Sequence, residues 1–116
     1  MTSARALREP LERLYRGFDY GARIERDAIQ FPIRYAEPRD REIAGLLTAC
    51  LAYGRVDLFG RQLEGVLAAM GSSPARFVRE FEPRRDAARF AAFRYRFNRP
   101  RDLTAFCVAA RDLLAR

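Results

Sequence analysis

Lysine, histidine and tryptophan are absent from this sequence, and cysteine occurs only twice in 116 residues. Without histidine, the chain by itself cannot supply an imidazole base, a histidine metal ligand or a Ser-His-Asp triad. Cys50 and Cys107 stand alone in apolar helical patterns with no metal-ligand spacing, so we expect two buried, unreactive thiols. The sequence therefore predicts neither a metal site nor a cofactor.

Long apolar runs and a secretory signal are also missing. No segment approaches the roughly 18 consecutive apolar residues that suggest a membrane span. Residues 1–10 lack the apolar core of a signal peptide. We therefore expect a cytoplasmic protein with no membrane partner.

The composition that is present is typical of a folded protein. Hydrophobic residues make up 49% and charged residues 32% of the chain, which argues against disorder, and the length suits one domain spanning residues 1–116. All 22 basic residues are arginine, against 15 acidic ones, so the net charge is +7. A GC-rich coding bias would also produce this abundance of arginine and alanine, so arginine content alone does not indicate a nucleic-acid partner.

Apolar residues recur at helical spacing along nearly the whole chain, which predicts an all-α unit of about six helices. The first helix is expected to begin near Glu9, because proline suits a first helical turn. A stripe of apolar residues should lie on one face of this segment, opposite arginine and glutamate: Leu7, Leu11, Leu14, Tyr15 and Phe18. Residues 27–35 are expected to form one helical turn or a connector broken at Pro32.

Two strong helices follow. The first is predicted from Pro38 to a C-terminal cap at Gly54, with a stripe of Ile43, Leu46, Leu47, Cys50 and Leu51. Asp57 is expected to cap the second, which carries Phe59, Leu63, Val66, Leu67 and Met70 and ends at Gly71. Leu47 and Leu63 should lie in the core.

The last third of the sequence predicts three further helices. One begins at Ser73-Pro74 with Phe77, Val78 and Phe81 facing inward; another begins at Pro83 and buries Phe90, Phe93 and Phe97. The last begins near Pro100 with a stripe of Leu103, Phe106, Cys107, Ala110 and Leu114. No stop signal follows it, so we expect a truncated chain that leaves Leu103, Phe106 and Leu114 partly exposed. A frayed natural terminus is the alternative.

Two segments are candidates for nucleic-acid binding. Tyr53, Gly54 and Arg55 lie at the junction of the two strong helices, where a ring and a cation can meet a phosphate backbone beside a helix N-terminus. In the segment FRYRFN (residues 93–98), Arg94 and Arg96 alternate with aromatic residues and precede Asn98, an arrangement that can hold bases and phosphates. Each segment also has a structural alternative. The first is a turn whose tyrosine packs and whose arginine is solvated. The second is the end of a helix, with Phe93 and Phe97 in the core and Arg94, Tyr95 and Arg96 outside.

The remaining charged groups favour structural roles or stay open. Asp40, Glu42, Asp57, Glu64 and Asp102 form the acidic set, whose aspartates fall where helix caps and first turns favour an acid, so we expect no catalytic carboxylate pair. The segment from Arg34-Tyr35 to Asp40 is either a loop with a cap or a polar network beneath the first junction. Arg84, Arg85, Arg89, Arg99 and Arg101 suit a nucleic acid or a solvated face equally well.

Several strings resemble an uncharacterised bacterial family, domain-of-unknown-function family 2400, in order along nearly the whole chain. They are FPIRY (31–35), PRDREIAGLL (38–47), LAYGRV (51–56) and YRFN (95–98). Members of that family are about twice this length, and their second half is similar to the helix-hairpin-helix DNA glycosylases. The resemblance implies a multi-helix orthogonal bundle like the helical domain of those enzymes, with this chain as its N-terminal half.

In those enzymes the segment matching residues 51–58 inserts a polar side chain beside a flipped base. Tyr53, Gly54 and Arg55 stand at that place here, and the usual glutamine is absent. The resemblance implies DNA as a partner and no catalysis from this chain alone, because the catalytic residues belong to the second half. A helical protein-interaction domain and part of a base-excision glycosylase are the two alternatives.

Overall fold

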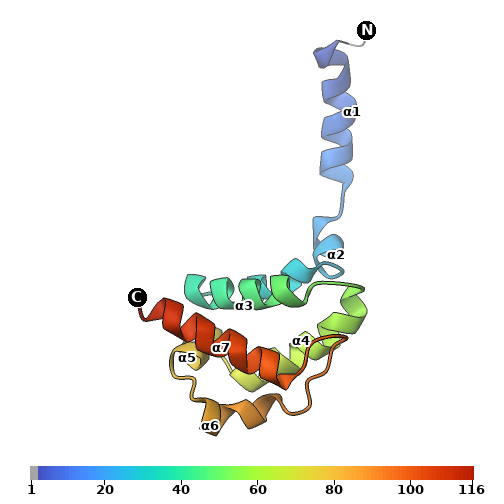
Figure 1. Ribbon diagram of the computed structural model, residues 1–116. Helices are drawn as coiled ribbons and strands as arrows, with labels where there is room; N and C mark the ends of the chain where they lie inside the picture. The colour runs from blue at the N-terminus through green and yellow to red at the C-terminus, as the bar shows by residue number, and fades with distance from the viewer. Residues whose placement is uncertain (1–2) are drawn as a thin grey trace.

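The computed structural model describes residues 3–116, which form α-helices joined by shorter helical turns (Figure 1). The long helices are α1 (Ala4–Gly17), α3 (Pro38–Leu51), α4 (Val56–Met70) and α7 (Pro100–Leu114). The short ones are α2 (Tyr20–Ile24), α5 (Pro74–Arg79) and α6 (Pro83–Asp86), with 3-10 turns η1 (Ala28–Gln30), η2 (Pro32–Arg34) and η3 (Ala87–Phe90). This part of the chain holds no strand beyond an isolated bridge between Tyr95 and Asn98. The prediction of an all-α bundle is confirmed.

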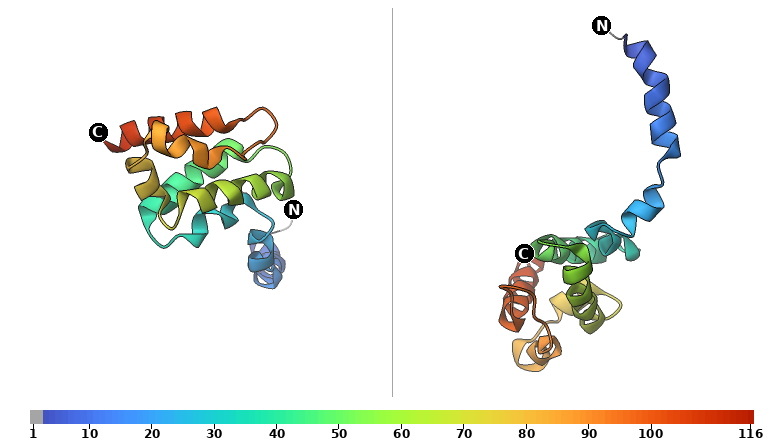
Figure 2. Two further views of the ribbon diagram at one scale, coloured as in Figure 1. Left: turned by 90° about the horizontal axis from the view of Figure 1, so that it is seen from below. Right: turned by 90° about the vertical axis from the view of Figure 1, so that its right-hand side faces the viewer.

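The core lies between α3, α4, α5 and α7, and Figure 2 shows these helices gathered at one end of the molecule. Leu47 and Leu63 are 1% and 0% exposed, as predicted. The three long helices of the bundle each bury a stripe set by helical spacing: Ile43, Ala44, Leu47 and Leu51 on α3; Phe59, Leu63, Val66, Leu67 and Met70 on α4; Leu103, Cys107 and Ala110 on α7.

The predicted stripe of α3 was wrong at two positions. Leu46 and Cys50 are exposed, whereas Ala44 and Thr48 are buried. At 100° per residue, Ala44 and Leu47 lie near the middle of the buried face of α3, and Leu46 and Cys50 lie to one side of that face. The expectation of two buried thiols therefore holds for Cys107 alone.

Helix α1 projects away from the bundle and buries none of its residues (Figures 1 and 2). The hydroxyl of Ser3 accepts a hydrogen bond from the Ala6 N–H at 3.2 Å, so the helix begins at Ala4 and carries Pro10 inside it, not in its first turn. Its predicted stripe lies on one face but is uncovered, with exposures from 47% at Leu7 to 72% at Leu14. None of the five stripe residues is buried against the rest of the described chain.

The single helix expected from Pro83 to Phe97 was also wrong. After α6 and η3 the chain leaves the helix, and a tight turn joins Tyr95 to Asn98 through two backbone hydrogen bonds of 2.8 and 3.3 Å. The turn reverses the expected sides: Tyr95 is 6% exposed and Phe97 is 89% exposed. Phe93 is buried as predicted, because it still lies against the core.

Polar contacts fix how the later helices meet α3. Asp40 is 7% exposed, and its Oδ1 accepts hydrogen bonds from the Ser73 hydroxyl at 2.7 Å and the Ala75 N–H at 3.0 Å. Asp40 lies in the first turn of α3, and its carboxylate also caps the N-terminus of α5.

The burial of α7 differs in part from the expectation. Leu103 is buried, so the expectation that it is left partly exposed was wrong, while Phe106 and Leu114 are half-buried.

Candidate functional site

The two segments singled out in the sequence lie against each other at one end of the bundle. The Tyr53 hydroxyl is within hydrogen-bonding distance of the Tyr95 carbonyl oxygen, at 3.0 Å, and of Asn98 Oδ1. In return, the Tyr95 hydroxyl donates to the Tyr53 carbonyl oxygen, and the two rings lie 4.9 Å apart. We call the surface formed by residues 52–57 and 93–102 the arginine corner.

Gly54 permits this close approach. Its φ is +84°, a conformation that other residues rarely adopt. A Cβ added at Gly54 would lie 2.7 Å from the Tyr95 hydroxyl and 2.8 Å from Arg96 Nη2. Glycine is therefore required here both by the backbone and by its neighbours.

The structure engages Tyr53 and Arg55 in contacts within the protein. Tyr53 is half-buried, and its hydroxyl holds the 95–98 turn. Arg55 forms a bidentate ion pair with Asp57: its Nε donates to Oδ1 at 3.1 Å and its Nη2 donates to Oδ2 at 2.9 Å. Both side chains are largely exposed. Tyr53 thus positions its neighbours, and the charge of Arg55 is partly offset.

The exposed groups of the corner come from the 93–101 segment. Arg94, Arg96 and Arg101 are exposed and form no ion pair with any described residue. Arg96 has φ +50°, and its guanidinium lies over the rings of Tyr53 and Tyr95, at 6.0 and 5.7 Å from their centroids. Phe97 was predicted to lie in the core because it is four residues after Phe93, the spacing of one helix face. Residues 95–98 form a turn and not a helix, so Phe97 is exposed next to Arg96.

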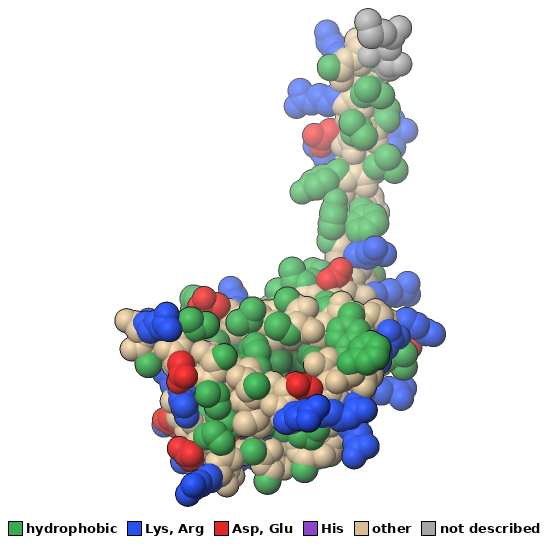
Figure 3. Space-filling view, viewed as in Figure 1, with side chains coloured by type: hydrophobic (Ala, Val, Ile, Leu, Met, Phe, Trp, Pro, Cys, Tyr) green, Lys and Arg blue, Asp and Glu red, His purple; other side chains and the backbone are tan. Residues whose placement is uncertain are grey.

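Charge is uneven over the corner. Residues 52–57 and 93–102 contain five arginines (55, 94, 96, 99 and 101) and two aspartates (57 and 102). Asp102 accepts the Arg99 N–H at 2.6 Å, as an acid in a first helical turn should. Figure 3 shows basic side chains gathered at the end of the bundle where α4 begins, whereas at the opposite end they alternate with acidic ones.

A pocket of about 200 Å³ lies next to the corner. Its lining includes the side chains of Arg61 and Arg89 and the rings of Phe90 and Phe93. Gln62, also in the lining, accepts the Arg94 N–H through Oε1 at 3.1 Å and so joins the pocket to the corner. No sequence signal indicated this pocket, because its residues come from α4 and from the segment that was expected to be a continuous helix.

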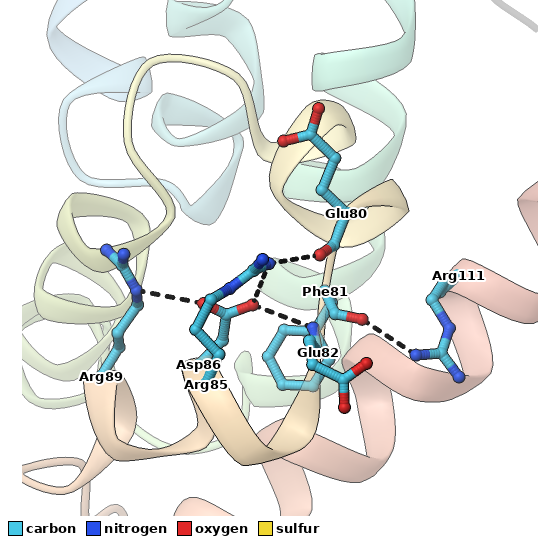
Figure 4. A network of polar contacts seen from close by, with 7 residues as sticks. All are labelled: Glu80, Phe81, Glu82, Arg85, Asp86, Arg89 and Arg111. Carbon is cyan, nitrogen blue, oxygen red and sulfur yellow. Dashed lines mark hydrogen bonds and ion pairs between the residues drawn. The ribbon is translucent and has the colours of Figure 1, made fainter.

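Within the 83–90 segment, the buried carboxylate of Asp86 is held by two arginines and a backbone N–H (Figure 4). Arg85 contacts it at 2.8 Å and Arg89 at 3.5 Å, and the Glu82 N–H donates to it at 2.9 Å. The hydrogen bond from Arg85 is the main cause that lowers the pKa of Asp86 to about 2, against the opposing effect of burial. The carboxylate therefore stays ionised near neutral pH and is unsuited to act as a general acid there.

The lowered pKa makes stability depend on pH. Asp86 has an ordinary pKa of 3.8 in the unfolded chain and about 2 in the folded one, so its contribution is complete above the unfolded value. We expect about 2 kcal/mol of unfolding free energy to be lost as the pH falls from about 4 to about 2. Urea unfolding across this range measures it. Asp86→Asn should be less stable at neutral pH and lose less stability on acidification; an equally steep loss in the variant would contradict the assignment.

Other titratable groups are held by structural partners. Arg34 forms two hydrogen bonds to Glu64, at 2.7 and 2.9 Å, and these bonds lower the pKa of the Glu64 carboxyl and raise that of Arg34. This pair joins η2 to α4. Burial raises the pKa of Cys107 to about 12, which makes it an unreactive thiol.

Metal and membrane features were searched in the described residues. Among residues 3–116, no group of three or more cysteine, aspartate or glutamate side chains is placed to hold a metal ion. None of the described helices combines the length and apolar content that crossing a bilayer requires.

A family model described as protein of unknown function, DUF2400, matches residues 27–116. The chain belongs to the DUF2400 family. The match covers the helical bundle and both halves of the arginine corner, and α1 and α2 precede it. No curated protein and no solved structure matches the chain. The expected membership of an uncharacterised family is confirmed, and the likeness of this DUF2400 protein to DNA glycosylases stays a prediction.

Proposed function

We propose that this protein binds DNA through the arginine corner. The observation that carries the proposal is that the two segments singled out for nucleic-acid binding, 42 residues apart at Tyr53 and Tyr95, form one surface. That surface has five arginines against two aspartates. Guanidinium groups bind phosphates with strong, charge-assisted hydrogen bonds, and such contacts supply most sequence-independent affinity for DNA.

Each part of the corner has a separate task. Arg94, Arg96 and Arg101 meet phosphates, because no carboxylate of the described chain occupies them. Helix α4 begins at the corner without a side-chain cap, so its first N–H groups add a favourable position for a phosphate. Tyr53, Gly54 and Asn98 hold the two turns together, and Arg55 contributes after release from Asp57.

Binding should depend steeply on salt. With a few phosphates engaged, we expect the affinity for duplex DNA to fall tenfold or more between about 50 and 200 mM salt. The double variant Arg94→Ala/Arg96→Ala should weaken binding at low salt and make the slope of log affinity against log salt shallower by about two. Fluorescence anisotropy with a labelled duplex measures both.

The matched control removes two arginines from α5, at the other end of the bundle (Figure 1). Arg76→Ala/Arg79→Ala changes the net charge equally, and both side chains are exposed. It should leave the salt slope within about half a unit of the parent value. Equal effects of the two double variants would indicate non-specific charge attraction, and no binding at low salt would refute the proposal.

A second candidate function is interaction with another protein, and the uncovered apolar stripe of α1 favours it. Leu11, Leu14 and Tyr15 are each at least 60% exposed on that helix, and such patches mark interaction surfaces. The two candidates use different surfaces. Retention of DNA affinity in Leu11→Ser/Leu14→Ser would assign DNA binding to the corner alone.

Base excision by a longer protein that contains this domain is a further reading, implied only by the resemblance to glycosylases. Such an enzyme extrudes the target base from the duplex before cleavage. An incision assay of the full-length gene product on a panel of damaged duplexes tests it. The chain described here is expected to bind without cleaving.

A further inference from the structure

The most exposed large apolar side chain of the bundle is Phe97, at 89%. It lies at the tip of the turn between Tyr95 and Asn98, next to Arg96 with its φ of +50°. The first central residue of such a two-residue turn takes a positive φ most easily when it is glycine. An arginine here places a strained backbone and a cation directly beside an uncovered ring.

The turn is held firmly by its surroundings. The Tyr95 carbonyl oxygen lies 3.0 Å from the Tyr53 hydroxyl, and the Asn98 side chain meets the same hydroxyl. Arg99 Nη1 donates to the carbonyl oxygens of Arg96 and Asn98, at 2.6 and 3.1 Å. The backbone around Phe97 is therefore fixed in the free protein, and a ring presented on a fixed turn loses little freedom on binding.

The surroundings of Phe97 decide what it can contact. Arg94 and Arg96 precede it in the chain, Arg99 and Arg101 follow it, and all four are exposed. An apolar protein surface that covered the turn would have to desolvate their charges. A nucleic acid strand offers bases beside phosphates, which matches one exposed ring flanked in the chain by exposed arginines. In an intact duplex the bases are stacked on one another and do not meet a protein ring.

We propose that Phe97 stacks on an unpaired DNA base, with phosphates of the same strand held by the flanking arginines. This inference rests on the proposed function and adds the substrate class: single-stranded or gapped DNA in preference to perfect duplex. Phe97 supplies the preference and the arginines supply the salt-dependent attraction.

The two roles separate in a binding experiment with the whole chain. At low salt the parent protein should bind a single-stranded oligonucleotide of mixed sequence more tightly than the matched duplex. Phe97→Ala should weaken single-strand binding about tenfold or more. Its effect on duplex binding should be less than about threefold, and the salt slope should be unchanged, because no phosphate contact is lost.

Two further variants control the experiment. Phe18→Ala removes a phenylalanine that is 49% exposed just after α1, far from the turn, and should change neither affinity. Because the sequence contains no tryptophan, Phe97→Trp introduces a single indole reporter. Its fluorescence should be quenched by single-stranded DNA and not by duplex, which a purely structural role for residue 97 would not produce.

The outcomes distinguish the two proposals. If the protein binds both DNA forms with a steep salt slope and Phe97→Ala matches the parent, stacking is refuted and the arginine corner stands. If single-strand preference is present but survives Phe97→Ala, Phe97 is not its source and the inference fails. If neither DNA form is retained at low salt, the proposed function fails first.

Discussion

Replacing Leu63 with alanine is expected to lower the free energy of unfolding by about 2–5 kcal/mol. Leu63 is fully buried at 0% exposure in the middle of α4, and its stripe faces the centre of the core. Truncation removes buried methyl groups and leaves a cavity that the surrounding helices fill only in part. Urea unfolding monitored by circular dichroism measures the change.

Leu58 provides the matched control for that measurement. It lies on the same helix, five residues earlier, and is 46% exposed. Leu58→Ala should cost less than about 1 kcal/mol, because little buried surface is lost and alanine favours a helix. Similar costs for the two variants would mean that α4 does not pack through the face described here.

Gly54→Ala is the second large prediction, with an expected cost of about 2 kcal/mol or more. A positive φ costs an L-residue roughly 1 kcal/mol or more. The new methyl would also lie 2.7 Å from the Tyr95 hydroxyl, so the hydrogen bond from that hydroxyl to Tyr53 must shift, at roughly 1 kcal/mol. Thermal and urea unfolding measure the sum of the two effects.

Gly65 is the control for this substitution. It lies inside α4 with no atom near the position of an added Cβ, so Gly65→Ala should stabilise the protein by about 0.5–1 kcal/mol. Opposite signs for the two glycine variants are the expected result. A neutral Gly54→Ala would show that the two turns of the arginine corner are not tied together as the contacts indicate.

Gly54→Ala also links the fold to the proposed function. The added methyl would lie 2.8 Å from Arg96 Nη2, so the guanidinium must leave its place over the tyrosine rings. DNA affinity should therefore fall in a variant that remains folded at low temperature. The same substitution tests whether the corner acts as one unit.

Sequence patterns correctly predicted the features that depend on residues close together in the chain. Helical spacing placed Leu47 and Leu63 in the core, and prolines marked the starts of α3, α5 and α7. These features depend on residues within one or two turns of each other. The sequence could not tell which side of α3 packs most deeply, so Leu46 and Cys50 were misplaced.

The candidate site was predictable as residue types and not as an arrangement. Tyr53, Asn98 and Arg96 were identified from their strings, but their mutual contacts span more than 40 residues and have no local signature. Phe97 shows the same limit most clearly. Its spacing from Phe93 predicts burial, and the backbone turn at Arg96 reverses it.

The amino-acid sequence by itself determined the helical periodicity, the arginine excess and the exclusion of histidine chemistry, because each follows from residue identity and near neighbours. Tertiary structure alone decided that α1 stands apart from the bundle, that Asp40 caps a helix 33 residues away, and that two distant turns form one basic surface. The physical reason is that burial and charge pairing depend on which elements meet, and contacts between distant segments leave no periodic trace in the chain.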